Sequence, residues 1–138
     1  MTHYDAAWEL VESMKTIFLG PIKNAEELLK GEVPVLCHIG ETEQITPTEL
    51  AHKFSLTTAR IATILNRLED KQLIVREHDN KDRRKVYIHL TEAGQKLAAT
   101  KIDELHKNLD NLLQALGEED AKEYLRLTKR VAEYMKRQ

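Results

Sequence analysis

The chain has 138 residues, a length that suits one compact domain, and its 21 basic and 23 acidic side chains give a net charge of −2. It contains no apolar run close to the roughly 20 residues that span a bilayer, and its first residues lack a signal-peptide pattern. We therefore expect a cytoplasmic protein without a membrane partner. The single cysteine, Cys37, excludes an intramolecular disulfide.

The N-terminal part of the chain predicts helices separated by glycine and proline. Apolar residues recur at steps of four and three from Tyr4 to Phe18, which predicts one amphipathic helix that Gly20-Pro21 interrupts. A second periodic stretch through Leu28-Leu29 ends at Gly31. Pro34 then suits the first turn of a short apolar helix, for which Gly40 is a candidate C-cap.

Two capped helices with a tight joint follow. Thr46 is a predicted N-cap, and Pro47 suits the first position of a helix that continues to Phe54. Thr57 caps the next helix, which we expect over residues 57–72. Its apolar residues share one face through their spacing of three and four, and they are Ile61, Ile64, Leu65 and Leu68.

The hydrophobic period changes to two after Gln72. Residues 73–77 and 86–90 each alternate as strands do, and the segment between them is polar and rich in turn-forming Asp and Asn. These features predict a β-hairpin with an exposed loop too long for a two-residue turn.

The C-terminal part predicts two long helices. Thr91 caps the first, whose apolar residues form a heptad-like seam through Ala98, Ile102, Leu105, Leu109, Leu112 and Leu116. Gly117 ends this helix, and acidic residues begin the last one. Because so narrow a seam needs a partner helix, we expect self-association.

Helix, tight turn, helix and basic hairpin, in this order, predict a winged helix-turn-helix, in which the second helix enters the major groove of DNA. Residues 47–91 carry nine basic and six acidic side chains, whereas the rest of the chain carries twelve and seventeen. The expected partner is therefore double-stranded DNA. The recognition-helix residues that we expect at DNA are Thr57, Thr58, Ala59, Arg60, Thr63 and Arg67. Arg60 suits guanine, whereas Thr58 and Thr63 suit a base edge or a thymine methyl.

The run from Asp82 to Gly94, DRRKVYIHLTEAG, resembles the wing signature of the MarR (multiple antibiotic resistance regulator) family. Residues 46–51, TPTELA, and 65–74, LNRLEDKQLI, resemble the two helices of that family at the same spacing. The resemblance implies that Asp82 pairs with Arg84 to shape the wing and that Arg84 enters the minor groove. The wing residues that it places at DNA are Lys81, Asp82, Arg83, Arg84 and Lys85.

Three positions depart from the family pattern. Ser55 stands where the turn commonly has glycine, Thr63 where a basic residue is frequent, and Gln72 where glycine often precedes the first wing strand. These departures leave the operator sequence and the number of phosphate contacts open.

The resemblance also implies a fold class and a division of the chain. The fold is mainly α (α+β), with a winged helix-turn-helix core at 31–91 and dimerisation helices at 1–30 and 92–138 within one compact chain. It implies a homodimeric repressor that binds a palindromic operator and responds to a small aromatic or lipophilic effector. The candidate effector pocket is lined by Trp8, Met14, Phe18 and Ile22, which alternatively form plain core.

Other functions fit the sequence less well than DNA binding does. The sequence has no phosphate loop, nucleophile elbow or acid–base pair, so we expect neither an enzyme nor a cofactor. A winged helix that contacts only proteins is the alternative, although basic residues on the second helix and the hairpin argue against it. Cys37 is a candidate oxidant sensor, but an apolar helix favours an inert thiol. The histidines lack a recognised metal-ligand spacing, so no metal is expected.

Overall fold

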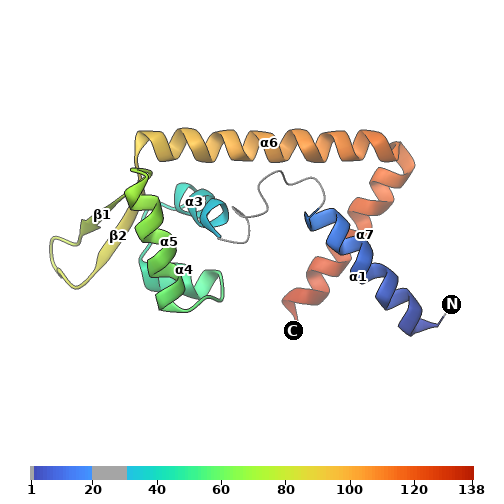
Figure 1. The fold of residues 1–138 in the computed structure, drawn as a ribbon, viewed down its shortest axis with the longest axis horizontal. Helices are drawn as coiled ribbons and strands as arrows, with labels where there is room; N and C mark the ends of the chain where they lie inside the picture. Colours follow the sequence, from blue (N-terminus) through green and yellow to red (C-terminus); the bar gives the residue numbers. More distant parts are fainter. Residues whose placement is uncertain (1, 20–30) are drawn as a thin grey trace. The chain divides into compact units, whose positions relative to one another are not determined.

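The computed structural model describes residues 2–19 and 31–138. Its elements are helix α1 (His3–Leu19), helices α3 (Glu32–Gly40), α4 (Pro47–Lys53) and α5 (Thr58–Asp70), strands β1 (Ile74–His78) and β2 (Val86–Leu90), and helices α6 (Glu92–Leu116) and α7 (Glu118–Lys136) (Figure 1). The predicted order of helix, helix, hairpin and two long helices is confirmed. The chain divides into two compact units, Met1–Gln95 and Lys96–Gln138.

The three predicted threonine caps begin helices as expected. The Oγ atom of Thr46 accepts a hydrogen bond from the Glu49 N–H at 3.2 Å, and that of Thr57 accepts one from the Arg60 N–H at 3.1 Å. The Thr91 hydroxyl accepts one from the Gly94 N–H at 3.0 Å. Each cap satisfies a backbone donor that the first helical turn leaves without a partner.

Some predicted boundaries were wrong by one or two residues. Helix α3 ends at Gly40, but its C-cap is Glu41 in a right-handed conformation, so Gly40 is not the cap. Helix α5 ends at Asp70 rather than at Gln72, and β1 begins at Ile74 rather than one residue earlier. The stretch predicted through Leu28-Leu29 and the break at Gly20-Pro21 lie outside the described residues.

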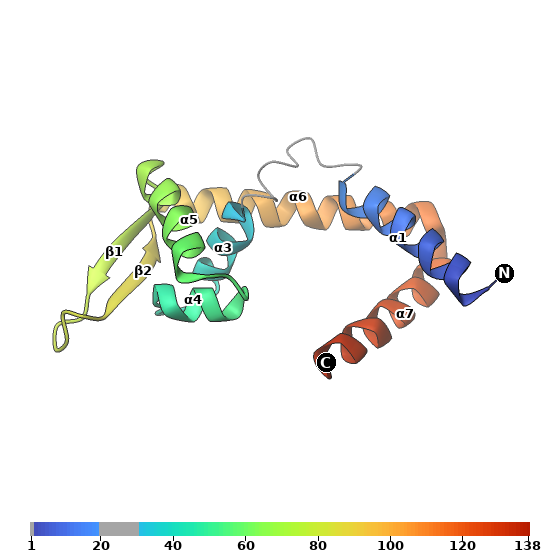
Figure 2. The same cartoon turned by 60° about the horizontal axis from the view of Figure 1, so that its bottom comes forward.

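The core of the winged region forms between α3, α4, α5 and the hairpin, as α3 and α4 pack on α5 and β2 while α5 packs on β1. Strands β1 and β2 are antiparallel, with Ile74 opposite Leu90 and His78 opposite Val86. The Ile88 N–H also donates to the Ile45 carbonyl at 2.9 Å, which ties the segment before α4 to β2. Figures 1 and 2 show the hairpin loop at the end of the strands far from these helices.

Buried hydrophobic residues are concentrated between Val35 and Ala98, and they include Leu36, Leu50, Ile61, Ile64, Leu65, Leu68, Ile74 and Ile88 at 2% exposure or less. Helix α7 has no buried residue. Within the described parts of the chain, the helices are either too short or too polar to cross a membrane.

Candidate nucleic-acid interface

Helix α5 has one buried face and one solvent-facing surface. Ile61, Ile64 and Leu65 are fully buried and Leu68 is 1% exposed, which matches the face expected from their spacing. Thr57, Thr58, Ala59 and Thr63 are exposed, whereas Arg60 is half-buried. The Thr63 hydroxyl donates to the Ala59 carbonyl at 3.1 Å, so it keeps acceptor capacity toward solvent. The N-terminal half of α5 thus presents small and polar side chains on a rigid helix.

Arg67 lies differently from the other predicted contact residues. Its guanidinium Nη1 is 4.0 Å from the Glu32 Oε1, and the Lys71 Nζ is 2.7 Å from the Glu32 Oε2. The Glu32 side chain is only 8% exposed, so these two cations compensate a buried carboxylate. This contact places the Arg67 guanidinium near the start of α3, and its Nη1 is buried without a hydrogen-bond partner in the described part of the chain.

The wing loop has a defined shape because an aspartate organises its backbone. The Asp82 Oδ1 accepts hydrogen bonds from the Arg84 N–H at 3.1 Å and from the Arg84 Nε at 3.3 Å. The Asp79 N–H donates to the Lys85 carbonyl at 3.0 Å, and the Lys85 N–H donates to the Asp82 carbonyl at 3.0 Å. The pair expected between Asp82 and Arg84 is therefore present in the free protein.

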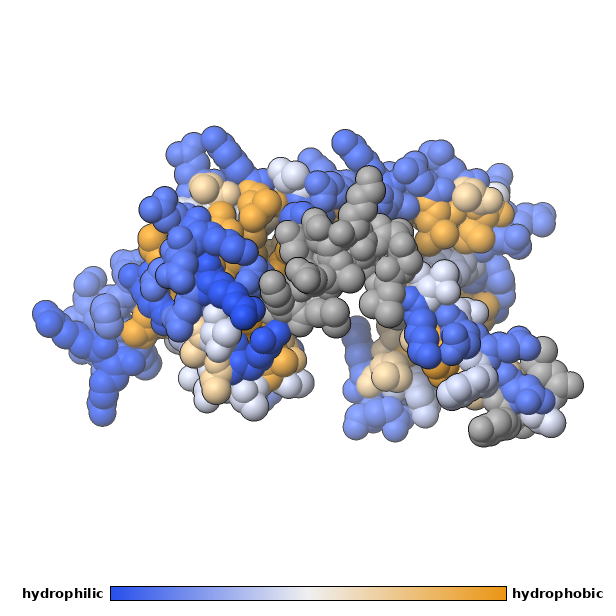
Figure 3. Space-filling view, viewed as in Figure 1, coloured by the Kyte–Doolittle hydropathy of each residue, from blue (hydrophilic) through white to orange (hydrophobic). Residues whose placement is uncertain are grey.

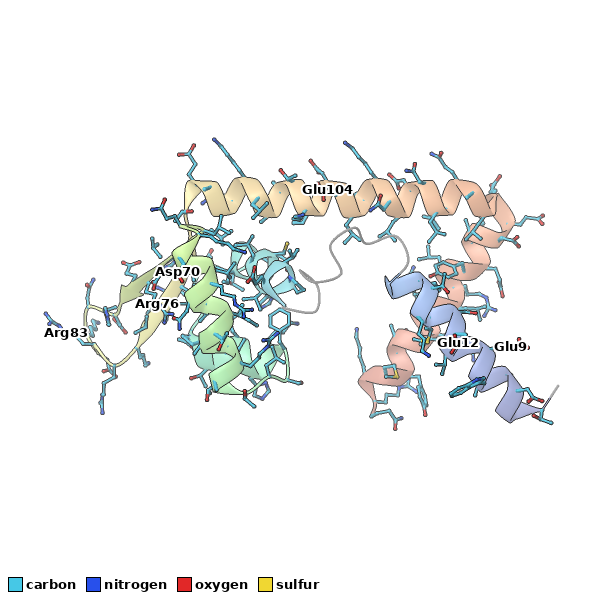
Figure 4. The ribbon with its side chains drawn as sticks, in the orientation of Figure 1. Glu9, Glu12, Asp70, Arg76, Arg83 and Glu104 are labelled. Carbon is cyan, nitrogen blue, oxygen red and sulfur yellow. The ribbon has the colours of Figure 1, made fainter. Side chains whose placement is uncertain are left out.

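The cations of the wing project into solvent. The Arg84 side chain is 93% exposed, and Lys81, Arg83 and Lys85 are also exposed. Figure 4 shows Arg83 at the loop, pointing away from the helices, and Figure 3 shows hydrophilic residues over the whole hairpin tip. So exposed a group of cations attracts phosphate strongly at low salt.

Comparisons with known proteins show which family and which proteins this chain is similar to. The MarR family model matches residues 30–86, which cover α3 through the start of β2. The transcriptional regulator FarR of Neisseria gonorrhoeae is 29% identical over 78% of this chain and 73% of its own length. The uncharacterised HTH-type transcriptional regulator YwhA of Bacillus subtilis is 30% identical over 64% of this chain, and the match spans 63% of that protein.

Residues 30–86 of the chain are similar to the MarR family.

The fold of the chain is similar to that of solved structures over nearly its full length. The structure of Streptococcus pneumoniae FabT in complex with DNA superposes with a TM-score of 0.81 at 22% identity, covering 94% of this chain and 97% of that chain. The predicted fold class, mainly α with a winged helix-turn-helix, is confirmed. The expectation of a DNA-binding transcription regulator rather than an enzyme agrees with the names of the relatives.

The two positions where this chain lacks the glycine that is usual in the MarR family have left-handed backbone. Ser55, in the turn between α4 and α5, has φ 52°, and Gln72, before β1, has φ 60°. Glycine adopts this conformation without strain, whereas a residue with a Cβ atom does not. The two departures in sequence therefore carry a cost in conformational energy.

Gly94 explains the glycine at the end of the wing signature. A Cβ atom at this position would lie 2.0 Å from the Leu73 carbonyl oxygen, because the first turn of α6 approaches the backbone before β1. The Thr91 hydroxyl donates to the Gln72 carbonyl at 2.7 Å and the Thr91 N–H to the Leu73 carbonyl at 3.0 Å. Leu73 and Thr91 thus fasten α6 to the base of the hairpin.

The predicted effector pocket is only partly described. Trp8 and Met14 lie on α1 with 61% and 44% of their surface exposed, whereas the Phe18 side chain and Ile22 lie outside the described residues. The hollow beside the wing is lined by His78, Asp79, Asn80 and Arg83, so it shares no residue with the predicted pocket.

The Cys37 side chain is half-buried. Burial raises the pKa of its thiol, and the nearby Glu41 carboxylate raises it further to a smaller extent. A raised pKa lowers the thiolate fraction at neutral pH, which favours the inert thiol over the oxidant sensor. In the described parts of the chain, no three His, Cys, Asp or Glu side chains are grouped to hold a metal ion.

Two structural features were missed from the sequence. Glu32 and Lys71 are 39 residues apart, and no local pattern links them. Arg76 bonds to Asn66 and Glu69 of α5. The alternation of residues along β1 could have predicted the contacts of Arg76 with α5, because Arg76 lies on the same strand face as the buried Ile74.

Proposed function

We propose that this chain is a homodimeric repressor that binds a palindromic operator, with α5 in the major groove and the wing in the adjacent minor groove. The observation that carries the proposal is Arg84, which Asp82 orients while 93% of its side chain stays in solvent. A guanidinium held in place before binding loses little conformational freedom when it enters the narrow, negatively charged groove. Thr58, Ala59, Arg60 and Thr63 supply the major-groove contacts.

Self-association is supported by the exposed apolar side chains of the terminal helices. Leu105, Leu109, Leu112 and Leu116 of α6 are 36% to 56% exposed, and Figure 3 shows apolar groups on this part of α6. Exposed apolar area of this kind is characteristic of interaction surfaces. We propose that a second copy of the chain covers it, with residues 1–30 and 92–138 as the dimerisation helices.

A two-fold dimer predicts a two-fold operator. Two recognition helices contact half-sites about one helical turn, or ~34 Å, apart, so the expected site is an inverted repeat of roughly 16 to 20 base pairs. Occupancy of such a site over a promoter excludes polymerase, which is the basis for proposing repression. A small aromatic or lipophilic effector stays a prediction, with Trp8 and Met14 as its described candidates.

The test is selection of DNA fragments from a random duplex pool by the purified protein, repeated with Arg84→Ala. We expect an inverted repeat from the wild type and about tenfold weaker binding from the variant, as for loss of one contact of about 1.4 kcal/mol. Lys129→Ala, which removes an exposed cation from α7, is the matched control and is expected to bind as the wild type. Enrichment of no sequence, or equal effects of the two variants, would contradict the proposal.

A further inference from the structure

Arg76 joins the wing to the recognition helix. It lies on β1 two residues after the buried Ile74, so its side chain leaves the strand on the face that packs against α5. Its Nε donates to the Glu69 Oε2 at 3.2 Å, and its Nη2 donates to the Asn66 Oδ1 at 3.0 Å. Figure 4 shows Arg76 beside α5, between that helix and the hairpin.

The geometry of this contact restrains orientation as well as distance. Asn66 and Glu69 are three residues apart on α5, so they lie on one side of the helix about one turn apart. A planar guanidinium that bonds to both through two different nitrogens restrains the strand against sliding and against rotation. The Arg76 side chain is 31% exposed and the Glu69 side chain 46%, so the pair is partly shielded from water.

We propose that Arg76 is a positioning residue that sets the orientation of the wing relative to α5, so that both contact DNA at once. This inference rests on the proposed function, because it assigns α5 to one groove and the wing to the next. Without the link, the wing is still held by the packing of β1 on α5, by the packing of β2 on α3 and α4 and by the Ile45–Ile88 hydrogen bond, but it samples more orientations relative to α5. Each wing contact then forms at a greater entropic cost.

The competing explanation is that Arg76 contacts a phosphate directly. The two explanations predict opposite effects of Glu69→Gln. Electrostatics alone predicts tighter DNA binding, because the substitution removes a negative charge from the protein surface near DNA. Loss of positioning predicts weaker binding, because a neutral amide holds the guanidinium less strongly than a carboxylate does.

Asp70→Asn is the matched control. Asp70 is exposed on the same helix next to Glu69, so its substitution removes the same charge without touching the Arg76 contacts. We expect Asp70→Asn to bind DNA as tightly as the wild type or more tightly. We expect Glu69→Gln and Arg76→Ala each to bind about three- to fivefold more weakly, and the double variant to bind no more weakly than Arg76→Ala alone.

The measurement is fluorescence anisotropy with a labelled duplex of the selected operator over a range of salt concentrations. Because a loosened wing and a lost phosphate contact both reduce the salt dependence, the comparison of Glu69→Gln with Asp70→Asn distinguishes the two explanations. A hydroxyl-radical footprint should show weaker protection of the minor groove with major-groove protection retained. In the Arg76→Ala background, Arg84→Ala should cost less than in the wild type.

Two results would overturn the inference. One is a Glu69→Gln variant that binds as tightly as Asp70→Asn, and the other is strict additivity of Arg76→Ala with Arg84→Ala. Thermal melting of each variant controls for folding, and Glu69→Gln keeps the test decisive if Arg76→Ala is unfolded. A wild type that binds no duplex would overturn the proposed function and the inference together.

Discussion

The winged region and the terminal helices of this chain bury their apolar residues in different ways. All the buried hydrophobic residues of the described chain lie between Val35 and Ala98. Of the large hydrophobic residues that are exposed, only Val75 belongs to the winged region, and the others lie on α1, α7 and the part of α6 beyond Ala98. The winged region therefore has a core of its own, whereas the terminal helices keep exposed apolar faces, which the proposed dimer would cover.

This difference teaches that the two regions have different stability requirements. The winged region is fastened internally by threonine caps, the Glu32 cluster and the close approach at Gly94. The terminal helices carry surface ion pairs such as Lys122 with Glu118, which contribute little to stability. Substitutions in the first region should therefore affect folding of the chain, and substitutions in the second should affect assembly.

The largest expected effect is on assembly. Leu109→Asp places a charge on the apolar seam of α6, where Leu109 is 46% exposed. Because burying an uncompensated carboxylate is costly, we expect dimer dissociation to rise on the order of 100-fold. Sedimentation velocity measures the dissociation of the dimer. Asn111→Asp, which adds the same charge off the seam, should leave the dimer intact, and equal effects of both substitutions would break the comparison.

A large effect on folding is expected at Gly94. Gly94→Ala places a Cβ atom 2.0 Å from the Leu73 carbonyl oxygen. The backbone cannot easily move to relieve this clash, so we expect the free energy of unfolding to fall by about 3 kcal/mol. Gly40→Ala is the matched control, because its Cβ would lie 3.0 Å from the flexible end of Leu90 and should cost under about 1 kcal/mol. Urea unfolding followed by circular dichroism measures the free energy of unfolding of both variants. A similar decrease for Gly94→Ala and Gly40→Ala would contradict the close approach at Gly94.

The buried Glu32 carboxylate predicts an asymmetry between partners. Lys71→Met removes the ammonium group 2.7 Å from the Glu32 Oε2 and leaves the carboxylate buried. We therefore expect the free energy of unfolding to fall by about 1–2 kcal/mol, after allowance for the exposure of Lys71. Glu32→Gln leaves Lys71, which is 56% exposed and which water can solvate, so it should lower the free energy of unfolding less, although the Arg67 Nη1 stays buried. Unfolding free energies measured at neutral pH test this order. A larger loss for Glu32→Gln would show that the carboxylate is not the costly group.

The left-handed residues predict a small gain in stability. Ser55→Gly and Gln72→Gly relieve a strain of about 1–2 kcal/mol but lose about 0.5–1 kcal/mol through greater freedom of the unfolded chain. The net gain should be about 0.5–1 kcal/mol each, visible as a higher melting temperature. Ser55→Ala keeps a Cβ atom and is the control that should not gain. No gain from either glycine would argue against the strained conformations.

The smallest expected effect concerns Cys37. Burial and the nearby Glu41 carboxylate raise its pKa, so the thiolate becomes abundant only above the pH range at which an ordinary thiol ionises. At pH 7 the folded chain should react with iodoacetamide more slowly than the same chain in urea. Hydrogen peroxide should leave DNA affinity unchanged. Rapid alkylation at pH 7 together with loss of DNA binding in peroxide would restore the oxidant-sensor hypothesis.

Local signals account for most of what the sequence predicted. Thr46, Thr57 and Thr91 were predicted as caps because a cap acts within three residues of itself. The hairpin followed from a change of period at Gln72, and the Asp82–Arg84 pair was implied by the resemblance of residues 82–94 to the MarR-family wing signature. These features need no knowledge of distant parts of the chain.

Features that depend on distant residues were not predicted. The contact of Arg67 with the buried Glu32 of α3 was not predicted, and the expectation that Arg67 contacts DNA stays a prediction. The Ile45–Ile88 hydrogen bond and the Arg76 contacts with α5 likewise depend on tertiary packing. A long basic side chain can reach either way from a helix flank, so only its neighbours in space decide its role.

The most direct test of the account is the stoichiometry of the complex on the selected operator. Sedimentation equilibrium of the protein with a duplex that contains one inverted repeat should give two chains per duplex. The same duplex with one half-site scrambled should bind much more weakly. One chain per duplex, with affinity unchanged by scrambling, would contradict a two-fold regulator that uses both its recognition helices and both its wings.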